Sequence, residues 1–130
     1  MKIADRLDHL RIEFPGCSTL AYADISTETV LASSSEGGLR QEHLNDLCAT
    51  AVEMFATPST TALRDVVGTA GDHDNCIFQV IIMDAQQIGV FVRSTNSPTD
   101  ALCCVCDPSL DIPAFLPIVR QNLEAIGQDT

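Results

Sequence analysis

Basic and aromatic residues are scarce in this sequence. It has no tryptophan, one tyrosine and five phenylalanines, and its single lysine is Lys2. Seven Lys plus Arg residues stand against eighteen Asp plus Glu residues, which gives a formal net charge of −11. Nucleic-acid surfaces need basic side chains for phosphates and, for single strands, aromatic rings for stacking. So acidic a surface also repels anionic lipid headgroups. We therefore expect no nucleic-acid partner and no membrane partner.

Long apolar runs are missing as well. No segment approaches the roughly 20 apolar residues that a transmembrane helix requires. The first residues, Met1 to Arg6, include an acidic residue too early for a signal peptide. We expect a cytoplasmic protein, and in a reducing compartment its six cysteines are expected to be free thiols.

The motifs of several large enzyme classes are absent too. The sequence contains no Gly-x-Ser-x-Gly, no Walker lysine loop and no Gly-x-Gly-x-x-Gly. With one lysine near the N-terminus, a P-loop that cradles a nucleotide is excluded. No arginine is singled out by its context as a residue that reaches into a partner's active site. We predict a protein that is not an enzyme and that carries no cofactor.

Apolar material for a core is plentiful. Hydrophobic residues make up 45% of the 130 residues, which suits a single domain spanning 1–130. Apolar residues recur with the period of a helix in some segments and of a strand in others. The predicted elements are a helix from Ile3 to Pro15-Gly16, strands at 17–25 and 29–33, a helix from Leu39 to Thr57-Pro58, strands at 76–83, 88–94 and 101–106, and a helix from about Asp107 to Gly127.

Two parts of this assignment carry specific expectations. In the last helix, Pro113 fits an early helical position, Pro117 should kink or delay the helix, and Gly127 is the expected C-cap. Residues 58–75 have no clear pattern. The later strands are apolar on both sides and need cover on both faces. A five-stranded, mostly antiparallel sheet with helices on both faces meets that need.

Three local segments in the first half follow one another in a characteristic order. Phe14-Pro15-Gly16-Cys17 enters a strand, Ala23-Asp24 stands at the turn, and Thr29-Val30-Leu31-Ala32-Ser33 is the return strand. These segments resemble the roadblock/dynein light chain family. With the element order, the resemblance extends from Leu7 to Ile126. The sequence departs from the family in lacking a glycine in the hairpin turn and in its extended 58–75 segment. Longin, profilin and PAS-like folds share a similar layout and stay open as alternatives.

The resemblance implies a fold and a mode of action. The fold is α+β: an α/β/α layered roadblock, or profilin-like, fold in the order α-β-β-α-β-β-β-α. Members of the family pair through the middle helix and the strand after it, here 39–55 and 76–83. The expected function is a homodimeric scaffold that binds a Ras-like small GTPase or assembles a protein complex. The predicted dimer interface consists of Leu44, Leu47, Cys48, Ala51, Ile77, Gln79, Ile81 and Met83.

The strand expected at 76–83 supports association without reference to any family. It carries no charged residue. An apolar, uncharged strand at the edge of a sheet invites pairing with another chain unless something covers it. The alternative is that this strand lies in the middle of the sheet of its own subunit.

Three groups of residues could carry other chemistry. Cys103, Cys104 and Cys106 lack the spacing of a zinc site, and a strand would place Cys103 on one face and the other two on the opposite face. Buried thiols that pack as small apolar groups are the expected role. Asp72-His73-Asp74 reads as a solvated loop rather than a cation site. Glu42, His43, Asn45 and Asp46 are expected to form a polar face of the middle helix.

Two rival functions follow from these alternatives. A ligand-sensing domain of the profilin or PAS type would hold a small molecule between sheet and helices. A thiol or metal enzyme would use Cys103, Cys104, Cys106 or His73. The sequence identifies neither the partner nor whether a bound GTPase is activated.

Overall fold

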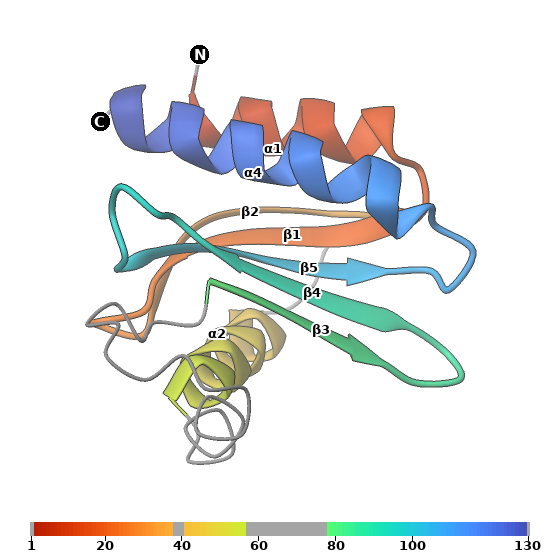
Figure 1. The fold of residues 1–130 in the computed structure, drawn as a ribbon, viewed down its shortest axis with the longest axis horizontal. Helices are drawn as coiled ribbons and strands as arrows, with labels where there is room; N and C mark the ends of the chain where they lie inside the picture. Colours follow the sequence, from red (N-terminus) through yellow and green to blue (C-terminus); the bar gives the residue numbers. More distant parts are fainter. Residues whose placement is uncertain (1, 38–40, 57–77, 130) are drawn as a thin grey trace, which may run out of the picture.

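The structure is a computed structural model, and it describes residues 2–37, 41–56 and 78–129. Its elements follow the predicted order α-β-β-α-β-β-β-α (Figure 1). They are α1 (Ile3–Glu13), β1 (Cys17–Asp24), β2 (Thr29–Ser35), α2 (Gln41–Ala56), β3 (Gln79–Met83), β4 (Ile88–Arg93), β5 (Asp100–Cys106) and α4 (Ile112–Asp129). Residues 58–75, whose pattern was unclear, lie outside the described residues.

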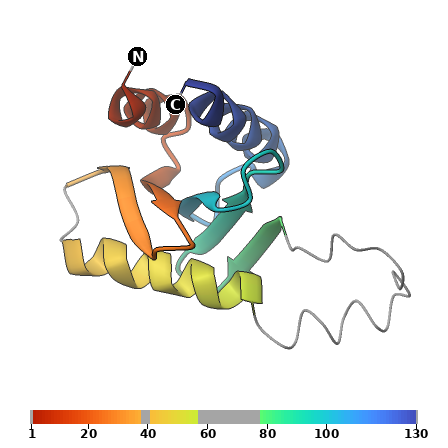
Figure 2. The ribbon, with the colours of Figure 1, turned by 90° about the vertical axis from the view of Figure 1, so that its left-hand side faces the viewer.

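The strands form one five-stranded sheet in the order β2-β1-β5-β4-β3. All neighbouring strands are antiparallel, and β1 and β2 form the predicted hairpin. Helices α1 and α4 cover one face, and α2 lies across the other (Figure 2). The predicted layered fold with helices on both faces is therefore confirmed.

The larger core lies between the sheet and the pair α1 and α4. Leu7 and Leu10 from α1 are buried there, as are Phe115 and Val119 from α4. The ring of Phe14, at the end of α1, meets that of Phe115 edge to face, with 5.0 Å between centroids. Apolar residues one helical turn apart on each helix thus face the same sheet surface, which removes their side chains from water.

A smaller core lies between α2 and the sheet. Leu44, Ala51 and Phe55 from the helix pack against Phe91 and Cys103 from the strands. Leu44 and Ala51, which were predicted to lie in a dimer interface, are therefore on the side of α2 that faces its own sheet.

The last helix corrects two predictions. Asp111 caps its start, since its Oδ1 accepts a hydrogen bond from the Ala114 N–H at 3.2 Å. Pro117 does not delay α4, because the helix begins before it at Ile112 and continues past it; a kink at Pro117 stays a prediction. The prediction that Gly127 is the C-cap is wrong, since α4 runs on to Asp129. Burial of apolar side chains on either side of Pro117 offsets the hydrogen bond that proline cannot donate.

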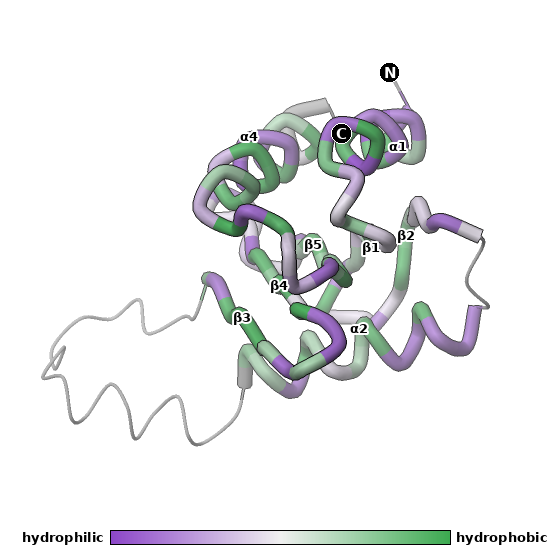
Figure 3. The backbone as a smooth tube through the Cα atoms, turned by 90° about the vertical axis from the view of Figure 1, so that its right-hand side faces the viewer, coloured by the Kyte–Doolittle hydropathy of each residue, from purple (hydrophilic) through white to green (hydrophobic). Residues whose placement is uncertain are grey.

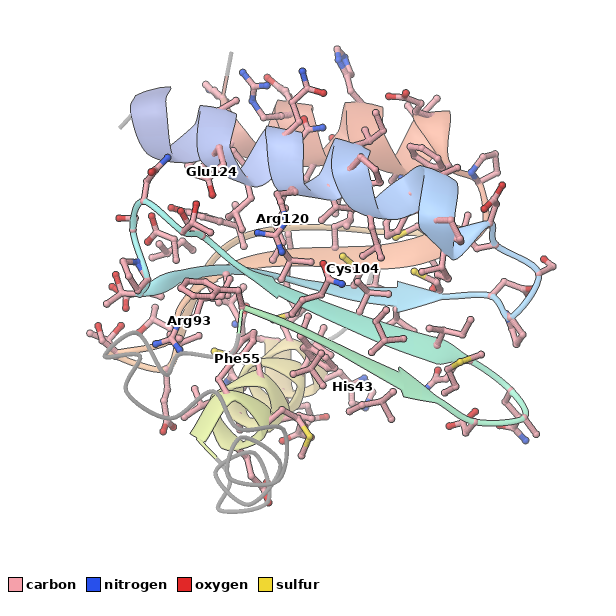
Figure 4. The ribbon with its side chains drawn as sticks, viewed as in Figure 1. His43, Phe55, Arg93, Cys104, Arg120 and Glu124 are labelled. Carbon is pink, nitrogen blue, oxygen red and sulfur yellow. The ribbon has the colours of Figure 1, made fainter. Side chains whose placement is uncertain are left out.

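One carboxylate joins α4 to the loop between β4 and β5. Glu124 accepts hydrogen bonds from Ser94 Oγ at 3.1 Å, from the Thr95 N–H at 3.0 Å and from Asn96 Nδ2 at 2.7 Å. Figure 4 shows Glu124 between the helix and this loop. Several donors on one carboxylate hold the loop in place more firmly than any single bond.

None of the helices within the described ranges is long and apolar enough to cross a membrane.

Candidate functional site

Strand β3 is an edge strand with exposed apolar side chains. It is the last strand of the sheet, at the edge opposite to β2. The alternative that this strand lies in the middle of the sheet is therefore wrong. Ile81 is 38% exposed, Ile82 40% and Met83 71%. Figure 3 shows this largely hydrophobic strand at the margin of the sheet. The strand begins at Gln79 rather than at the predicted Cys76, and Cys76 and Ile77 lie outside the described residues.

The hydrogen-bond pattern tells which backbone groups face the open edge. Phe78 accepts a bond from the Arg93 N–H, and the Asp84 N–H donates to Gln87. The register between β3 and β4 has no irregularity, and bonded pairs alternate along an antiparallel ladder. The even-numbered residues of β3 therefore bond to β4. The backbone N–H and C=O groups of Gln79, Ile81 and Met83 point away from the sheet.

The opposite edge of the sheet is built differently. The pairing of β2 with β1 shifts register where Tyr22 pairs with Ala32 and Ala23 with Val30, so Leu31 is an extra residue. The turn before β2 contains Glu28 with a positive φ of 55°. A bulge bends an edge strand and interrupts its row of free backbone groups. Of the two edges, β3 is the regular one.

Helix α2 divides the predicted interface residues into two groups. Leu44, Cys48 and Ala51 are buried against the sheet of their own subunit. Leu47 is half-buried at the flank of the helix. With Ile77 outside the described residues, the accessible members of the predicted interface are Leu47, Gln79, Ile81 and Met83. The interface itself stays a prediction.

The outer side of α2 is acidic. Glu42, Asp46 and Glu53 are exposed at spacings of four and seven residues, which places them on one stripe. The described helix contains no lysine and no arginine. His43 is exposed next to this stripe (Figure 4), and Asn45 Oδ1 accepts a bond from Gln41 Nε2 at 3.1 Å. The predicted polar face of the middle helix is confirmed.

A groove separates α2 from the sheet, with one part against β1 and β5 and the other reaching β3 and β4. One part has a volume of about 520 Å³, and the adjoining part about 230 Å³. Leu47 and Thr50 line both parts from the helix. From the sheet, the smaller part is lined by Ile82, Gly89, Phe91 and Val105 among others. The sequence reasoning missed Ile82, although its alternation with Ile81 places it on the face of α2. The ligand-sensing alternative would place its small molecule in this space.

Arg93 is held by its own subunit. Its Nε donates to the Pro98 carbonyl at 2.5 Å, and its guanidinium lies 5.5 Å from the centroid of the Phe55 ring (Figure 4). This cation–π contact fixes the end of α2 to the end of β4. On α4, Arg120 donates to Gln79 Oε1 at 3.2 Å. Arg93 therefore joins β4 to α2, and Arg120 joins α4 to β3.

The cysteines of β5 lie on opposite faces, as predicted. Cys103 packs in the α2 core, whereas Cys104 and Cys106 pack in the α1 and α4 core. All three are buried, and burial raises the pKa of the Cys103 thiol. Within the described ranges, no three His, Cys, Asp or Glu side chains are arranged to hold a metal ion. Asp72-His73-Asp74 lies outside those ranges.

Comparisons with known proteins place this arrangement among solved structures. A roadblock/LC7 domain from Streptomyces avermitilis superposes with a TM-score of 0.76 at 12% identity, over 98% of this chain and 97% of the other. The gliding protein MglB from Thermus thermophilus superposes with 0.75 at 14% identity, over 98% and 90%. The chain has the roadblock fold. MglC from Myxococcus xanthus superposes with 0.60 at 11% identity over the full length of both chains.

No family model and no curated protein matches the sequence. At these identities the roadblock fold is shared, while partners and assembly do not transfer from the similar proteins. Both helix layers and the edge strand β3 are features of this chain's own structure.

Proposed function

We propose that this roadblock-fold protein is a non-enzymatic scaffold whose two copies pair along β3. The observation that carries the proposal is an uncharged, regular edge strand whose apolar side chains are exposed. An edge of this kind is an association site unless it is protected by charge, proline or a bulge. Strand β3 has none of these protections.

Antiparallel pairing of the two β3 strands gives the scaffold its shape. The two-fold axis then stands perpendicular to the joined sheet, so equivalent faces of both copies lie on the same side. The two α2 helices share one face of the sheet, and the α1 and α4 pairs share the other. In this dimer, Leu47 and Ile82, which line the groove, lie on the side of each α2 that is nearer to the two-fold axis. The product is a continuous platform with a helical surface on each face.

The partner is proposed from the fold resemblance and from charge. Roadblock-type proteins are expected to bind Ras-like small GTPases or to assemble complexes. Glu42, Asp46 and Glu53 repeat on both copies of α2, and this doubled acidic surface suits a partner with a basic patch. The scaffold acts by shape: it changes the partner by binding one of its conformations more tightly than the other.

Dimerisation is tested with two exposed apolar residues at opposite edges. Light scattering during size exclusion at micromolar concentration should give the mass of a dimer. Ile81→Lys in β3 should reduce it to a monomer, because each copy places an unpaired charge in the new sheet. Leu31→Lys in β2 is the matched control and should leave the dimer unchanged, since Leu31 is 55% exposed at the other edge. A monomeric parent protein, or equal effects of the two substitutions, contradicts the proposal.

Partner binding is tested separately. Small GTPases loaded with GDP or with a GTP analogue are titrated onto the immobilised dimer at low and high salt. The proposal expects tighter binding of one nucleotide state and weaker binding at high salt, because exposed charges are screened. Equal binding of both states would remove the regulatory part of the proposal and leave the dimer itself untouched.

A further inference from the structure

Three cysteines meet where β1 begins and β5 ends. Cys17 is the first residue of β1 and Cys106 the last of β5, and the two are partners across the sheet. Cys104 lies two residues earlier in β5, on the same face. All three belong to the core beneath α1 and α4, where Figure 4 shows Cys104 between sheet and helix. None is part of the β3 edge or of the acidic helix.

The backbone pairing identifies Cys17 and Cys106 as the directly opposed pair. The Asp107 N–H donates to the Gly16 carbonyl at 2.7 Å, and these residues flank the pair of Cys17 with Cys106. Because Asp107 bonds to Gly16, Cys17 and Cys106 form a non-hydrogen-bonded pair at the end of the ladder, next to a register shift between Cys17 and Thr19. In a regular ladder the Cα atoms of such a pair lie about 4.5 Å apart. That spacing lies within the range of disulfide bonds. Cys104 faces Leu20 across the strands and is only diagonal to Cys17.

The surroundings of Cys17 also favour reaction of its sulfur. Hydrogen bonds from the thiols of Cys104 and Cys106 lower the pKa of Cys17, and the charge of Arg11 acts in the same direction. The same contacts raise the pKa values of the Cys104 and Cys106 thiols. The thiolate is the nucleophile of thiol chemistry, so Cys17 is the member of the cluster that attacks first. On the other face, burial and then the nearby Cys48 raise the pKa of the Cys103 thiol.

We propose that Cys17 and Cys106 are a thiol-oxidation site that forms a cross-strand disulfide on exposure to a low-molecular-weight disulfide such as oxidised glutathione. The Cys17 thiolate attacks one sulfur of the reagent, breaks its S–S bond and releases one thiolate. The Cys106 sulfur then attacks Cys17 in the mixed disulfide and releases the second. The two protein sulfurs lose two electrons, the reagent gains them, and the two thiol protons pass to the released thiolates.

Access to the site comes from its position at the ends of two strands. Both sulfurs are buried in the closed sheet, with Cys17 and Cys106 each 1% exposed. Terminal pairs of a sheet open locally at lower cost than central pairs. A surface pocket of about 210 Å³, lined by Gly16 and Cys106 among others, lies beside this end of the sheet. Once formed, the link ties the segment that follows α1 to the segment that precedes α4.

The test uses the full chain under native conditions. The protein is incubated with oxidised glutathione, quenched with acid and alkylating reagent, and examined by mass spectrometry. We expect loss of two hydrogen masses and a linked peptide that joins Cys17 to Cys106. Cys103→Ser is the matched control, since Cys103 is equally buried on the same strand but faces α2; this variant should form the same link. Cys106→Ser should form no internal link.

Several results would overturn the proposal. One is an unmodified native protein under conditions in which the urea-unfolded protein is oxidised. Another is a linked peptide that joins Cys17 to Cys104 as the main product. A third is loss of the link in Cys103→Ser while its circular dichroism spectrum stays native. The peptide map of the parent protein decides the matter even if Cys106→Ser fails to fold.

Discussion

Replacing Ile81 by proline removes one backbone donor from the open edge of β3. The Ile81 N–H points away from β4, so the bonds within the subunit are kept, and proline is tolerated at such edge positions. In a two-fold dimer the change occurs twice and removes two ladder bonds. At about 0.5–1.5 kcal/mol for each hydrogen bond, the dimer loses about 1–3 kcal/mol. This weakens its dissociation constant by about 5- to 150-fold.

The assay is sedimentation equilibrium over a concentration series, with two comparison variants. Ile81→Thr keeps the N–H group and a strand-forming side chain, so it should weaken the dimer less than Ile81→Pro. Ile82→Pro removes a donor that bonds to β4, so it should lower the thermal stability of the subunit itself. If Ile81→Pro associates as tightly as the parent protein, or Ile81→Thr is equally impaired, the edge-pairing argument is refuted.

Three further predictions concern stability and charge. Tyr22 is the chain's single tyrosine, and burial, with the nearby charge of Asp100, raises its pKa to about 12. Its ultraviolet titration should therefore have a midpoint near that value. A tyrosine in the unfolded chain ionises at about pH 10. The stability that the raised pKa of Tyr22 contributes is therefore fully present below about pH 10 and is lost as the pH rises through the pKa of the folded protein. Glu124→Gln should lower the free energy of unfolding by about 1–3 kcal/mol in urea melts, because it weakens the hydrogen bonds that hold the loop after β4 against α4. An unchanged midpoint would show that these hydrogen bonds do not stabilise the fold. Changing Glu42, Asp46 and Glu53 together to glutamine should slow association with a basic partner and flatten its salt dependence in surface plasmon resonance, without changing the dimer mass. A salt dependence like that of the parent protein would show that the acidic stripe does not face the partner.

The order of the elements could be predicted because the signals for it are local. A helix shows in apolar residues three and four positions apart, and a strand in alternation, and both depend on a short window of sequence. The lack of charge in β3 fitted a central strand as well as an edge strand, and only the order of the strands places β3 at an edge. The start of α4 was harder, because Asp107 and Asp111 each accept a bond from a backbone N–H further along. Only Asp111 caps the helix; Asp107 forms a turn with Ser109.

The candidate site depended on information that a local pattern does not hold. An apolar stripe on a helix fits burial against its own sheet as well as burial against a second copy. For Leu44, Cys48 and Ala51 the structure places it against the subunit's own sheet. The meeting of Cys17 with Cys106 depends on strand order, which joins residues far apart in sequence. Which amides of β3 bond to β4 and which point outward is also set by the pairing with β4 and cannot be read from β3 alone.

Amide hydrogen exchange along β3 tests the pairing of two copies most directly. In a lone subunit, the N–H groups of Val80 and Ile82 are bonded to β4, while those of Gln79, Ile81 and Met83 point away from β4 and from every other described strand. At a concentration where the protein is associated, we predict protection at all five positions, with the three outward amides losing protection on dilution. Rapid exchange of those three amides at every concentration would contradict the account.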